Sequence, residues 1–377
     1  MRKLGRTVGC ALLAVSMMFG SSVGTFAAEE KANRGLATKE TSKMRMPAIS
    51  AGCGILIDAK TGKILYSKNI DKKSYPASIT KILTTLVAID HNKYLNETVH
   101  FTDNAINSIE PGSTAIGIEP GENIPLEDVL YAIMLESANE ACNGVAEHTA
   151  GSLKKFANLM NQKAQELGCS NSHFVTTNGL HNKEHYVTAR DMATITKAAL
   201  NNPTFRKISC SSNHYMAGTN KEKKGREMWN HHKMVKRTAY LYRGIEGGKT
   251  GYTTVAGGTL VTFCKRNNTE LISVVLRGST MENYKDTTTL MNYGFNNYKS
   301  VTPFKGLNRT LKVVTPVTKT ANELVPYVMP LGDVSDISVL LTKNQKEKNL
   351  KVYTQKDKVY AKYGAEKLGA VSLYESK

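Results

Sequence analysis

The 377-residue sequence is short of negative charge, because its 32 Asp and Glu residues face 50 Lys and Arg residues and leave a formal charge of +18. It also contains no internal repeat and no low-complexity segment. Hydrophobic residues make up 41% and charged residues 22%, which is an ordinary globular composition. These features exclude collagen-like, disordered and multi-spanning membrane proteins.

Paired cysteines are also missing. The chain has six cysteines, of which Cys10 lies in the N-terminal segment. The others are widely scattered: Cys53, Cys142, Cys169, Cys210 and Cys264. An odd number without paired spacing predicts neither a disulfide framework nor a zinc knuckle, and we expect buried free thiols.

Residues 1–27 have the pattern of a secretory signal peptide. Arg2, Lys3 and Arg6 precede an apolar run from Val8 to Phe19, and small residues follow. Because a spanning helix needs about 20 apolar residues, this run is too short to cross a membrane. We expect export with cleavage near Ala27; the alternative is an uncleaved N-terminal anchor.

Removal of this segment leaves 47 basic against 32 acidic residues, or +15. A strongly basic exported protein suits an anionic surface, such as membrane lipids or an anionic wall polymer. Nucleic acid is the competing partner for such a charge. The sequence carries no recognisable nucleic-acid-binding motif, so we expect no nucleic acid partner.

The remaining chain divides into three parts. Residues 28–49 are polar without periodicity and predict a linker, residues 50–299 a large domain, and residues 300–377 a small all-β domain. In the large domain a β-hairpin is expected at 54–57 and 64–66, helices at 126–135, 140–149, 152–167 and 188–200, strands at 257–264 and 271–276, and a helix at 287–293. In the small domain, short strands are expected near 313–314, 325–328, 339–341 and 352–353. This order indicates one sheet covered by helices.

The first motif that carries chemistry is Ser78-Ile79-Thr80-Lys81, at the start of a helical pattern that follows Pro76. Side chains three residues apart share a helix face, so Ser78 and Lys81 are expected to be within hydrogen-bonding distance. A serine hydroxyl is a weak nucleophile until a neighbouring base takes its proton. Burial and a second cation would lower the pKa of Lys81 and supply the neutral amine.

Two further motifs follow in order. Ser137-Ala138-Asn139 lies between two predicted helices, and Lys249-Thr250-Gly251 leads into Tyr252 and the strand pair. A hydroxyl relays protons, an amide holds a peptide, and an ammonium beside a glycine suits a carboxylate. Each motif has a decoy elsewhere in the chain: Ser152-Leu153-Lys154-Lys155, Ser211-Ser212-Asn213 and Lys60-Thr61-Gly62.

In this order and placement, the three motifs resemble the fingerprint of the penicillin-interacting serine enzymes. Within them, the sequence looks most like the low-molecular-mass penicillin-binding proteins that are serine-type D-Ala-D-Ala carboxypeptidases. Three stretches support this: 74–78, 185–192 and 248–253. The resemblance implies an α/β (α+β) fold with a mostly antiparallel sheet and helices, plus a small C-terminal all-β domain.

The resemblance also implies roles. Ser78 would attack the penultimate D-Ala carbonyl of a peptidoglycan stem peptide, with Lys81 as general base and Ser137 as proton shuttle. Asn139, Lys249, Thr250 and Gly251 would bind substrate, and the backbone N–H groups of Ser78 and Tyr252 would form the oxyanion hole. β-Lactams would acylate Ser78, and the reaction needs no metal or organic cofactor.

Two departures from the family pattern are visible. A histidine commonly precedes the Gly-Leu pair that here reads Asn178-Gly179-Leu180. Many relatives also finish in an amphipathic anchoring helix, whereas this chain ends Ser372-Leu373-Tyr374-Glu375-Ser376-Lys377. We therefore expect no C-terminal anchor helix.

Three rival readings remain. The segment from His181 to His185 spells the inverted zinc motif His-x-x-Glu-His, but that chemistry needs a helix and Gly179 predicts a loop. A serine β-lactamase shares the triplet, but it uses an added glutamate that we do not find and lacks the β-rich tail. A wall-binding scaffold without catalysis is disfavoured because every required side chain is present.

His231 and His232 lie in a Lys-rich stretch, and we expect them on the surface.

Overall fold

The structure is a computed structural model that describes residues 45–235, 239–303, 315–320, 323–327, 338–355 and 358–372. The predicted signal peptide, nearly all of the predicted linker, the predicted strand at 313–314 and the last five residues lie outside the described residues.

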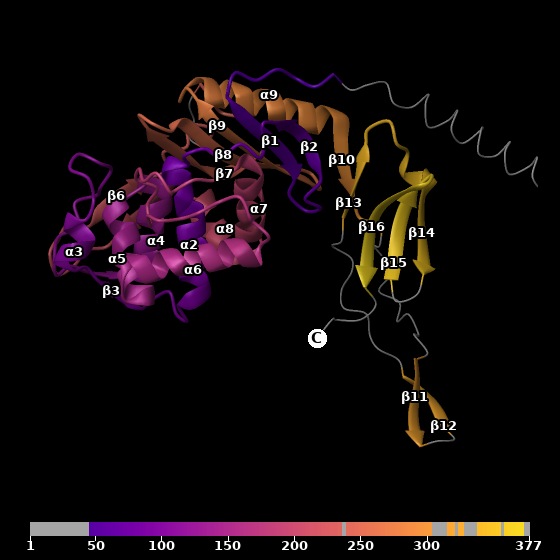
Figure 1. Cartoon of the computed structure of the whole chain (residues 1–377), viewed down its shortest axis with the longest axis horizontal. Helices are drawn as coiled ribbons and strands as arrows, with labels where there is room; N and C mark the ends of the chain where they lie inside the picture. The colour runs from indigo at the N-terminus through magenta and orange to yellow at the C-terminus, as the bar shows by residue number, and fades with distance from the viewer. Residues whose placement is uncertain are drawn as a thin grey trace, which may run out of the picture. The chain divides into compact units, whose positions relative to one another are not determined.

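A five-stranded antiparallel sheet is the centre of the large domain (Figure 1). The strand order is β2-β1-β9-β8-β7, so the N-terminal hairpin joins strands from the other end of the domain. The strands are β1 (Cys53–Asp58), β2 (Ile64–Lys68), β7 (Ile245–Thr253), β8 (Gly257–Arg266) and β9 (Thr269–Gly278). The predicted hairpin and strand pair are confirmed. The two strands of this pair are longer than the predicted 257–264 and 271–276, because Lys265 and Arg266 still pair with β9.

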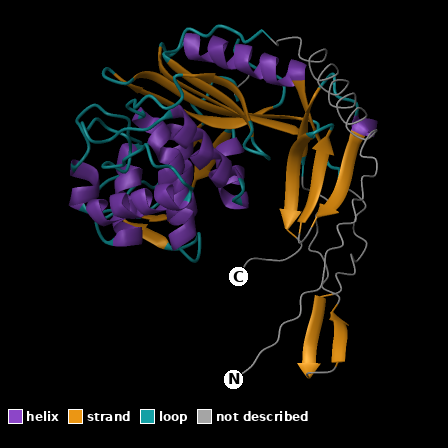
Figure 2. Cartoon of the chain, turned by 45° about the vertical axis from the view of Figure 1, so that its right-hand side comes forward, coloured by secondary structure: helices purple, strands orange, loops and turns teal. Residues whose placement is uncertain are grey.

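Helices cover this sheet, as the sequence indicated, and they lie on both of its faces (Figures 1 and 2). α9 (Glu282–Asn297) lies along one face, and it is longer than the predicted 287–293. The other helical elements are η1 (Ala77–Thr80), α2 (Lys81–His91), α3 (Asp103–Asn107), α4 (Leu126–Tyr131), the π-helix η2 (Ala132–Glu136), α5 (Asn139–Ala150), α6 (Leu153–Glu166), α7 (Ala189–Leu200) and α8 (Pro203–Cys210). Among these, α7 packs on β1 and β9.

Alternation along the strands explains the two-sided core. Ile55 and Ile57 belong to the large core that lies under α2, α5 and α7. Leu56 points the other way, toward Gly294 of α9. Because successive strand side chains face opposite sides, a nearly continuous apolar run is required where both faces are buried.

The helix starts follow local capping chemistry. Thr188 accepts a hydrogen bond from Asp191 N at 3.1 Å and caps α7. Ser152 accepts one from Lys155 N at 3.3 Å and caps α6. Gly151 and Gly168 follow α5 and α6 with positive φ, which explains where those helices stop.

The remaining strands form small sheets. These strands are β3 (Thr98–His100) with β4 (Asn123–Pro125), β5 (Asn213–Met216) with β6 (Arg226–Trp229), β10 (Tyr298–Val301) with β13 (Val339–Thr342), β11 (Thr315–Thr320) with β12 (Glu323–Tyr327), and the set β14 (Leu350–Gln355), β15 (Lys358–Tyr363) and β16 (Glu366–Ser372). A short 3₁₀ turn, η3 (Glu347–Asn349), precedes β14. The β character expected after residue 300 is present in β11 to β16, of which β15 and β16 were not predicted.

The free cysteines agree with the prediction, because Cys53, Cys142, Cys169 and Cys264 are buried and Cys210 is half-buried, all as thiols. Within the described residues, no helix is both long and apolar enough to cross a membrane.

The contact between α5 and Phe101 gives a test of the packing. A Cβ placed on Gly144 would lie 2.2 Å from Phe101 Cε1, and the Phe101 ring is fully buried. Overpacking costs about 1–3 kcal/mol, against about 1 kcal/mol gained from better helix propensity. We expect Gly144→Ala to lower the free energy of unfolding measured by urea titration. Adding Phe101→Leu should restore part of the loss, and an unchanged urea midpoint in Gly144→Ala would contradict the packing described.

Candidate active site

The predicted nucleophile, Ser78, lies in the 3₁₀ turn η1 immediately before α2. Ala77 has φ of 51° and φ in this left-handed region is uncommon for a residue with a side chain. This turn leaves Ser78 half-exposed while Lys81, the first residue of α2, is 0% exposed. Ser78 Oγ lies 3.0 Å from Lys81 Nζ, as the three-residue spacing predicted.

Lys81 Nζ has three polar neighbours. Besides Ser78 Oγ, it donates to Asn139 Oδ1 at 2.7 Å and to the carbonyl oxygen of Asn178 at 2.8 Å. As an ammonium, Lys81 donates to all three oxygens; as a neutral amine with two hydrogens and one lone pair, it can donate to these two acceptors and accept from the Ser78 hydroxyl. The three contacts therefore accommodate both forms of the lysine, including the neutral form that could take the serine proton.

Burial favours the same neutral form. It lowers the pKa of Lys81 from its ordinary value of 10.5 to about 8, while Cys142 and Glu140 act in the opposite direction. A lysine with this pKa is partly neutral at physiological pH.

The Ser137-Ala138-Asn139 segment is a tight connection between η2 and α5. Ser137 ends the π-helix in the left-handed conformation, with φ of 63° and ψ of 27°. π-helical turns of this kind are frequent at functional sites. Asn139 is the first residue of α5 and is buried, and its backbone N–H donates to Thr114 O at 2.9 Å.

Lys249-Thr250-Gly251 lies on β7, the edge strand that packs against η1. Lys249 is 2% exposed, and its Nζ donates to the carbonyl oxygen of Thr250 at 3.0 Å. Burial, and then the charge of Lys81, lower the pKa of Lys249 well below its ordinary value. Two lysines are therefore buried close enough together to affect each other.

Gly251 allows β7 to approach the nucleophile. A Cβ at Gly251 would lie 2.9 Å from Ser78 N and 2.4 Å from Thr259 Oγ1. Thr259 of β8 in turn donates to Pro76 O at 2.8 Å, which fixes the turn that carries Ser78. The absence of a side chain is thus a steric requirement at Gly251.

The structure brings together most of the residues proposed from sequence. Ser78, Lys81 and Asn139 are in direct contact, and Lys249 and Gly251 lie on the strand beside them. Ser137 lies in the turn before Asn139, and Thr250 is half-buried on β7. The side chain of Tyr252 is 62% exposed, so only its backbone belongs to the predicted oxyanion hole.

The three decoys lie elsewhere in the fold. Lys60-Thr61-Gly62 is the turn between β1 and β2, where Thr61 Oγ1 donates to Asp58 at 2.7 Å. Ser152 caps α6, and Lys154 and Lys155 are exposed beyond it. Ser211-Ser212-Asn213 joins α8 to β5.

Sequence reasoning missed the loop that carries Asn178. Its carbonyl oxygen accepts from Lys81, and a Cβ on the next residue, Gly179, would lie 2.0 Å from Ala77 O. Gly179 has φ of 89°, which a glycine adopts without strain. The Asn-Gly pair signalled a turn, but nothing in the sequence placed that turn against the nucleophile.

The zinc reading of the segment from His181 to His185 is wrong, because His185 has no nitrogen left for a metal. Its Nδ1 accepts from Val175 N at 3.1 Å and Thr176 N at 3.0 Å, so its Nε2 carries the hydrogen and donates to Thr80 Oγ1 at 2.9 Å. Burial lowers the pKa of His185 to about 3. The segment is a loop, as predicted, and the described residues contain no cluster of three or more His, Cys, Asp or Glu suited to a metal ion.

The prediction that His232 is on the surface is wrong. His232 is 1% exposed, its Nε2 lies 2.8 Å from Thr262 Oγ1, and its ring packs edge-on against Tyr284. It also lies under Gly248 of β7, where a Cβ would be 2.7 Å from the imidazole. His231 is exposed, as expected, and its Nε2 lies 2.8 Å from Glu136 Oε2.

The fold and this arrangement define a serine peptidase of the penicillin-binding-protein class. The D-alanyl-D-alanine carboxypeptidase family model matches residues 39–280. The chain therefore belongs to the D-alanyl-D-alanine carboxypeptidase family, and it is a serine peptidase with that activity. The family acts on peptidoglycan peptides that end in D-Ala-D-Ala, binds penicillin-type inhibitors and works at the cell wall.

Curated relatives agree with this assignment. The D-alanyl-D-alanine carboxypeptidase DacF of Bacillus subtilis is 33% identical over 73% of this chain and 69% of its own length. The D-alanyl-D-alanine carboxypeptidase DacA of Escherichia coli K12 is 32% identical over 69% of this chain and 64% of its own length. This chain thus aligns with about two thirds of each relative.

Solved structures share the fold. The Streptomyces K15 DD-transpeptidase matches with a TM-score of 0.62 and 28% identity, covering 67% of this chain and 99% of that chain. The D-alanyl-D-alanine carboxypeptidase of Mycobacterium tuberculosis H37Rv matches with a TM-score of 0.61 and 28% identity, covering 68% of this chain and 94% of that chain.

The pKa of Lys81 leads to a prediction for the pH profile. As the predicted general base, Lys81 would accept the serine proton in its neutral form, and the neutral fraction grows as pH rises through the pKa of Lys81. The rate of acylation by a fluorescent penicillin should therefore rise with pH, with its midpoint at a pH of about 8. Lys249→Arg keeps a cation that does not titrate in this range, so this variant should keep the same rising limb. A pH-independent rate would contradict a titrating Lys81.

Proposed function

We propose that this enzyme removes the terminal D-Ala from peptidoglycan stem pentapeptides through an acyl-enzyme on Ser78. Neutral Lys81 takes the Ser78 proton while Oγ attacks the carbonyl carbon of the penultimate D-Ala. The carbon–nitrogen bond then breaks, and the leaving amine receives a proton through Lys81 and Ser137. Water attacks the resulting ester, restores the Ser78 hydroxyl and leaves a peptide shortened by one D-Ala.

The observation that carries this proposal is the set of contacts around Lys81 Nζ. Ser78 Oγ, Asn139 Oδ1 and Asn178 O surround it at 2.7 to 3.0 Å, which leaves the amine lone pair for the serine proton. This is the nucleophile and base arrangement that serine acyl transfer requires. It also applies to a β-lactam, whose ring carbonyl presents the same electrophile to Ser78.

Lys249 and Thr250 are proposed to bind the terminal carboxylate of the peptide. A carboxylate offsets the cost of burying the Lys249 ammonium beside Lys81, and an ammonium–carboxylate hydrogen bond is stronger than a neutral one. Binding then favours peptides that end in a free carboxylate. This is the property that separates a carboxypeptidase from an internal peptidase.

The oxyanion hole is proposed to consist of the backbone N–H groups of Ser78 and Tyr252. The close approach of Gly251 to Ser78 N supports it, because that approach places the backbone after Gly251 beside the nucleophile. Removal of one such donor typically costs about 10²- to 10³-fold in rate.

The wider setting belongs to the same proposal. Residues 1–27 act as a signal peptide, residues 28–49 as a linker, residues 50–299 as the catalytic domain and residues 300–377 as a β-rich domain. The enzyme is exported to the outer face of the membrane or the cell wall. Its net positive charge supports contact with an anionic wall polymer or a membrane surface.

Two assays on purified protein test the nucleophile. Wild type should be labelled by a fluorescent penicillin and should release D-Ala from diacetyl-Lys-D-Ala-D-Ala, whereas Ser78→Ala should do neither because it has no hydroxyl to acylate. The matched control is Ser152→Ala, which removes the serine of the decoy motif and should retain both activities. Labelling of Ser78→Ala, or an unlabelled wild type, would overturn the proposal. Rapid loss of the label would indicate a β-lactamase instead.

The carboxylate site is tested with Lys249→Ala. Losing a hydrogen bond to a charged group should lower kcat/KM for the free-acid tripeptide by about ten- to hundredfold. The amide-capped tripeptide should be little affected. Lys60→Ala removes the lysine of the decoy motif and should change neither value. Equal losses on the acid and the amide would show that Lys249 does not bind the carboxylate.

A further inference from the structure

The segment Ser113–Ile118, which we call the strap, lies beside the Ser137-Ala138-Asn139 turn without regular secondary structure. Its position therefore depends on side chains and backbone groups of other elements. These contacts come from two elements: α5, which begins with Asn139, and β6, which carries Arg226.

On the active-site side, the strap is held by α5. Asn139 N donates to Thr114 O at 2.9 Å, and Ile116 N donates to Glu140 Oε1 at 2.7 Å. Asn139 and Glu140 are both buried. The strap is thus bonded to the residue whose side chain contacts Lys81 and to the residue that follows it.

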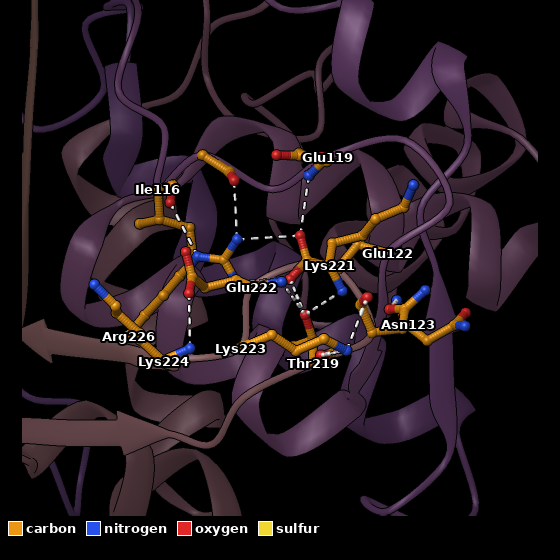
Figure 3. A network of polar contacts seen from close by, with 12 residues as sticks. Ile116, Glu119, Glu122, Asn123, Thr219, Lys221, Glu222, Lys223, Lys224 and Arg226 are labelled. Carbon is orange, nitrogen blue, oxygen red and sulfur yellow. Dashed lines mark hydrogen bonds and ion pairs between the residues drawn. The ribbon is translucent and has the colours of Figure 1, made fainter.

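On the other side, Arg226 of β6 holds the carbonyl groups of the strap (Figure 3). Its Nε donates to Ile116 O at 3.2 Å and its Nη2 to Gly117 O at 2.9 Å. Both backbone polar groups of Ile116 are therefore hydrogen-bonded: the N–H group to Glu140 and the carbonyl group to Arg226.

The guanidinium itself is fixed by Glu122, which is 0% exposed (Figure 3). Arg226 Nη1 lies 2.7 Å from Glu122 Oε1, and Nη2 lies 3.1 Å from Oε2. Thr219 Oγ1 donates to Oε1 at 2.6 Å and Glu119 N to Oε2 at 3.0 Å. Because both oxygens of the Glu122 carboxylate accept hydrogen bonds, its bidentate pair with Arg226 holds the guanidinium in a definite orientation.

The chain that leaves β6 holds the other flank of the turn. Trp229 N donates to Glu136, and His231 N donates to Leu135 O at 3.2 Å. The β5–β6 hairpin therefore contacts the strap through Arg226, and the chain that leaves it contacts the two residues before Ser137.

We propose that Arg226 is a positioning residue for the reaction, acting through the strap to hold Asn139 where its side chain meets Lys81. Arg226 does not touch the substrate. The inference rests on the proposed function of Ser78, Lys81 and Asn139, and it adds a residue from a hairpin that carries none of the three motifs. Small displacements matter here, because a shift of about 1 Å in a catalytic group costs about 10²-fold in rate.

The test compares Arg226→Gln and Arg226→Lys with Arg190→Gln. Arg190 is the matched control, because its bidentate pair with Asp71 is exposed and none of its contacts involves the strap. Titration with fluorescent penicillin gives the number of intact active sites in each preparation. The acylation rate per labelled site is then measured, together with kcat and KM on the tripeptide, so that unfolded protein does not contribute.

We expect Arg226→Gln to lower the acylation rate per labelled site and kcat by about tenfold or more, with KM changed much less. Arg226→Lys should recover part of the rate, since it keeps a donor toward the strap, and Arg190→Gln should match wild type. If Arg226→Gln does not fold, Glu122→Gln replaces it and should show the same loss in kcat. The inference is overturned if the folded variant, Arg226→Gln or Glu122→Gln, acylates at the wild-type rate per labelled site. It is also overturned if Arg190→Gln loses as much of this rate. A wild type that does not label at all contradicts the proposed function instead.

Discussion

The hydrogen bonds of the buried Lys81 amine are the interaction on which the rest of the site depends. Three parts of the chain meet at this atom: the turn that carries Ser78, the start of α5 with Asn139, and the loop with Asn178. Each contact constrains one element relative to the others. Because burial lowers the pKa of Lys81 to about 8, the same environment that joins these elements also prepares the base.

A second buried lysine, Lys249, is the residue proposed to give the site its preference for an anion. Burial and the charge of Lys81 lower the pKa of Lys249, and the nearby carboxyl of Glu140 is itself buried, which raises its pKa. Burial therefore disfavours the charged form of Lys249 as long as no anion lies beside it. In the proposed function, the terminal carboxylate of a substrate would offset this cost, so recognition and the activation of Ser78 would involve the same pair of lysines.

The local features of the fold could be predicted from the sequence, whereas contacts between distant segments could not. Thr188 as a helix cap follows from local chemistry, and the two-residue spacing of Ile55 and Ile57 follows from the strand period. The contact between Ser78 and Lys81 could be predicted because residues three apart share a helix face. By contrast, Asn178 contributes a backbone carbonyl, which any residue type could supply. His232 sits among lysines in sequence but under β7 in space, and the Arg226–Glu122 pair joins segments 104 residues apart.

The protonation state of Lys81 is the claim that can be tested most directly. The measurement is an NMR titration of the lysine Nζ and Cε resonances in labelled wild-type protein, with the Lys81 signal assigned by its loss in Lys81→Arg. This signal is expected to titrate at a pH of about 8, below the ordinary lysine value of 10.5. A Lys81 signal that titrates at the ordinary lysine value would contradict the neutral-amine mechanism.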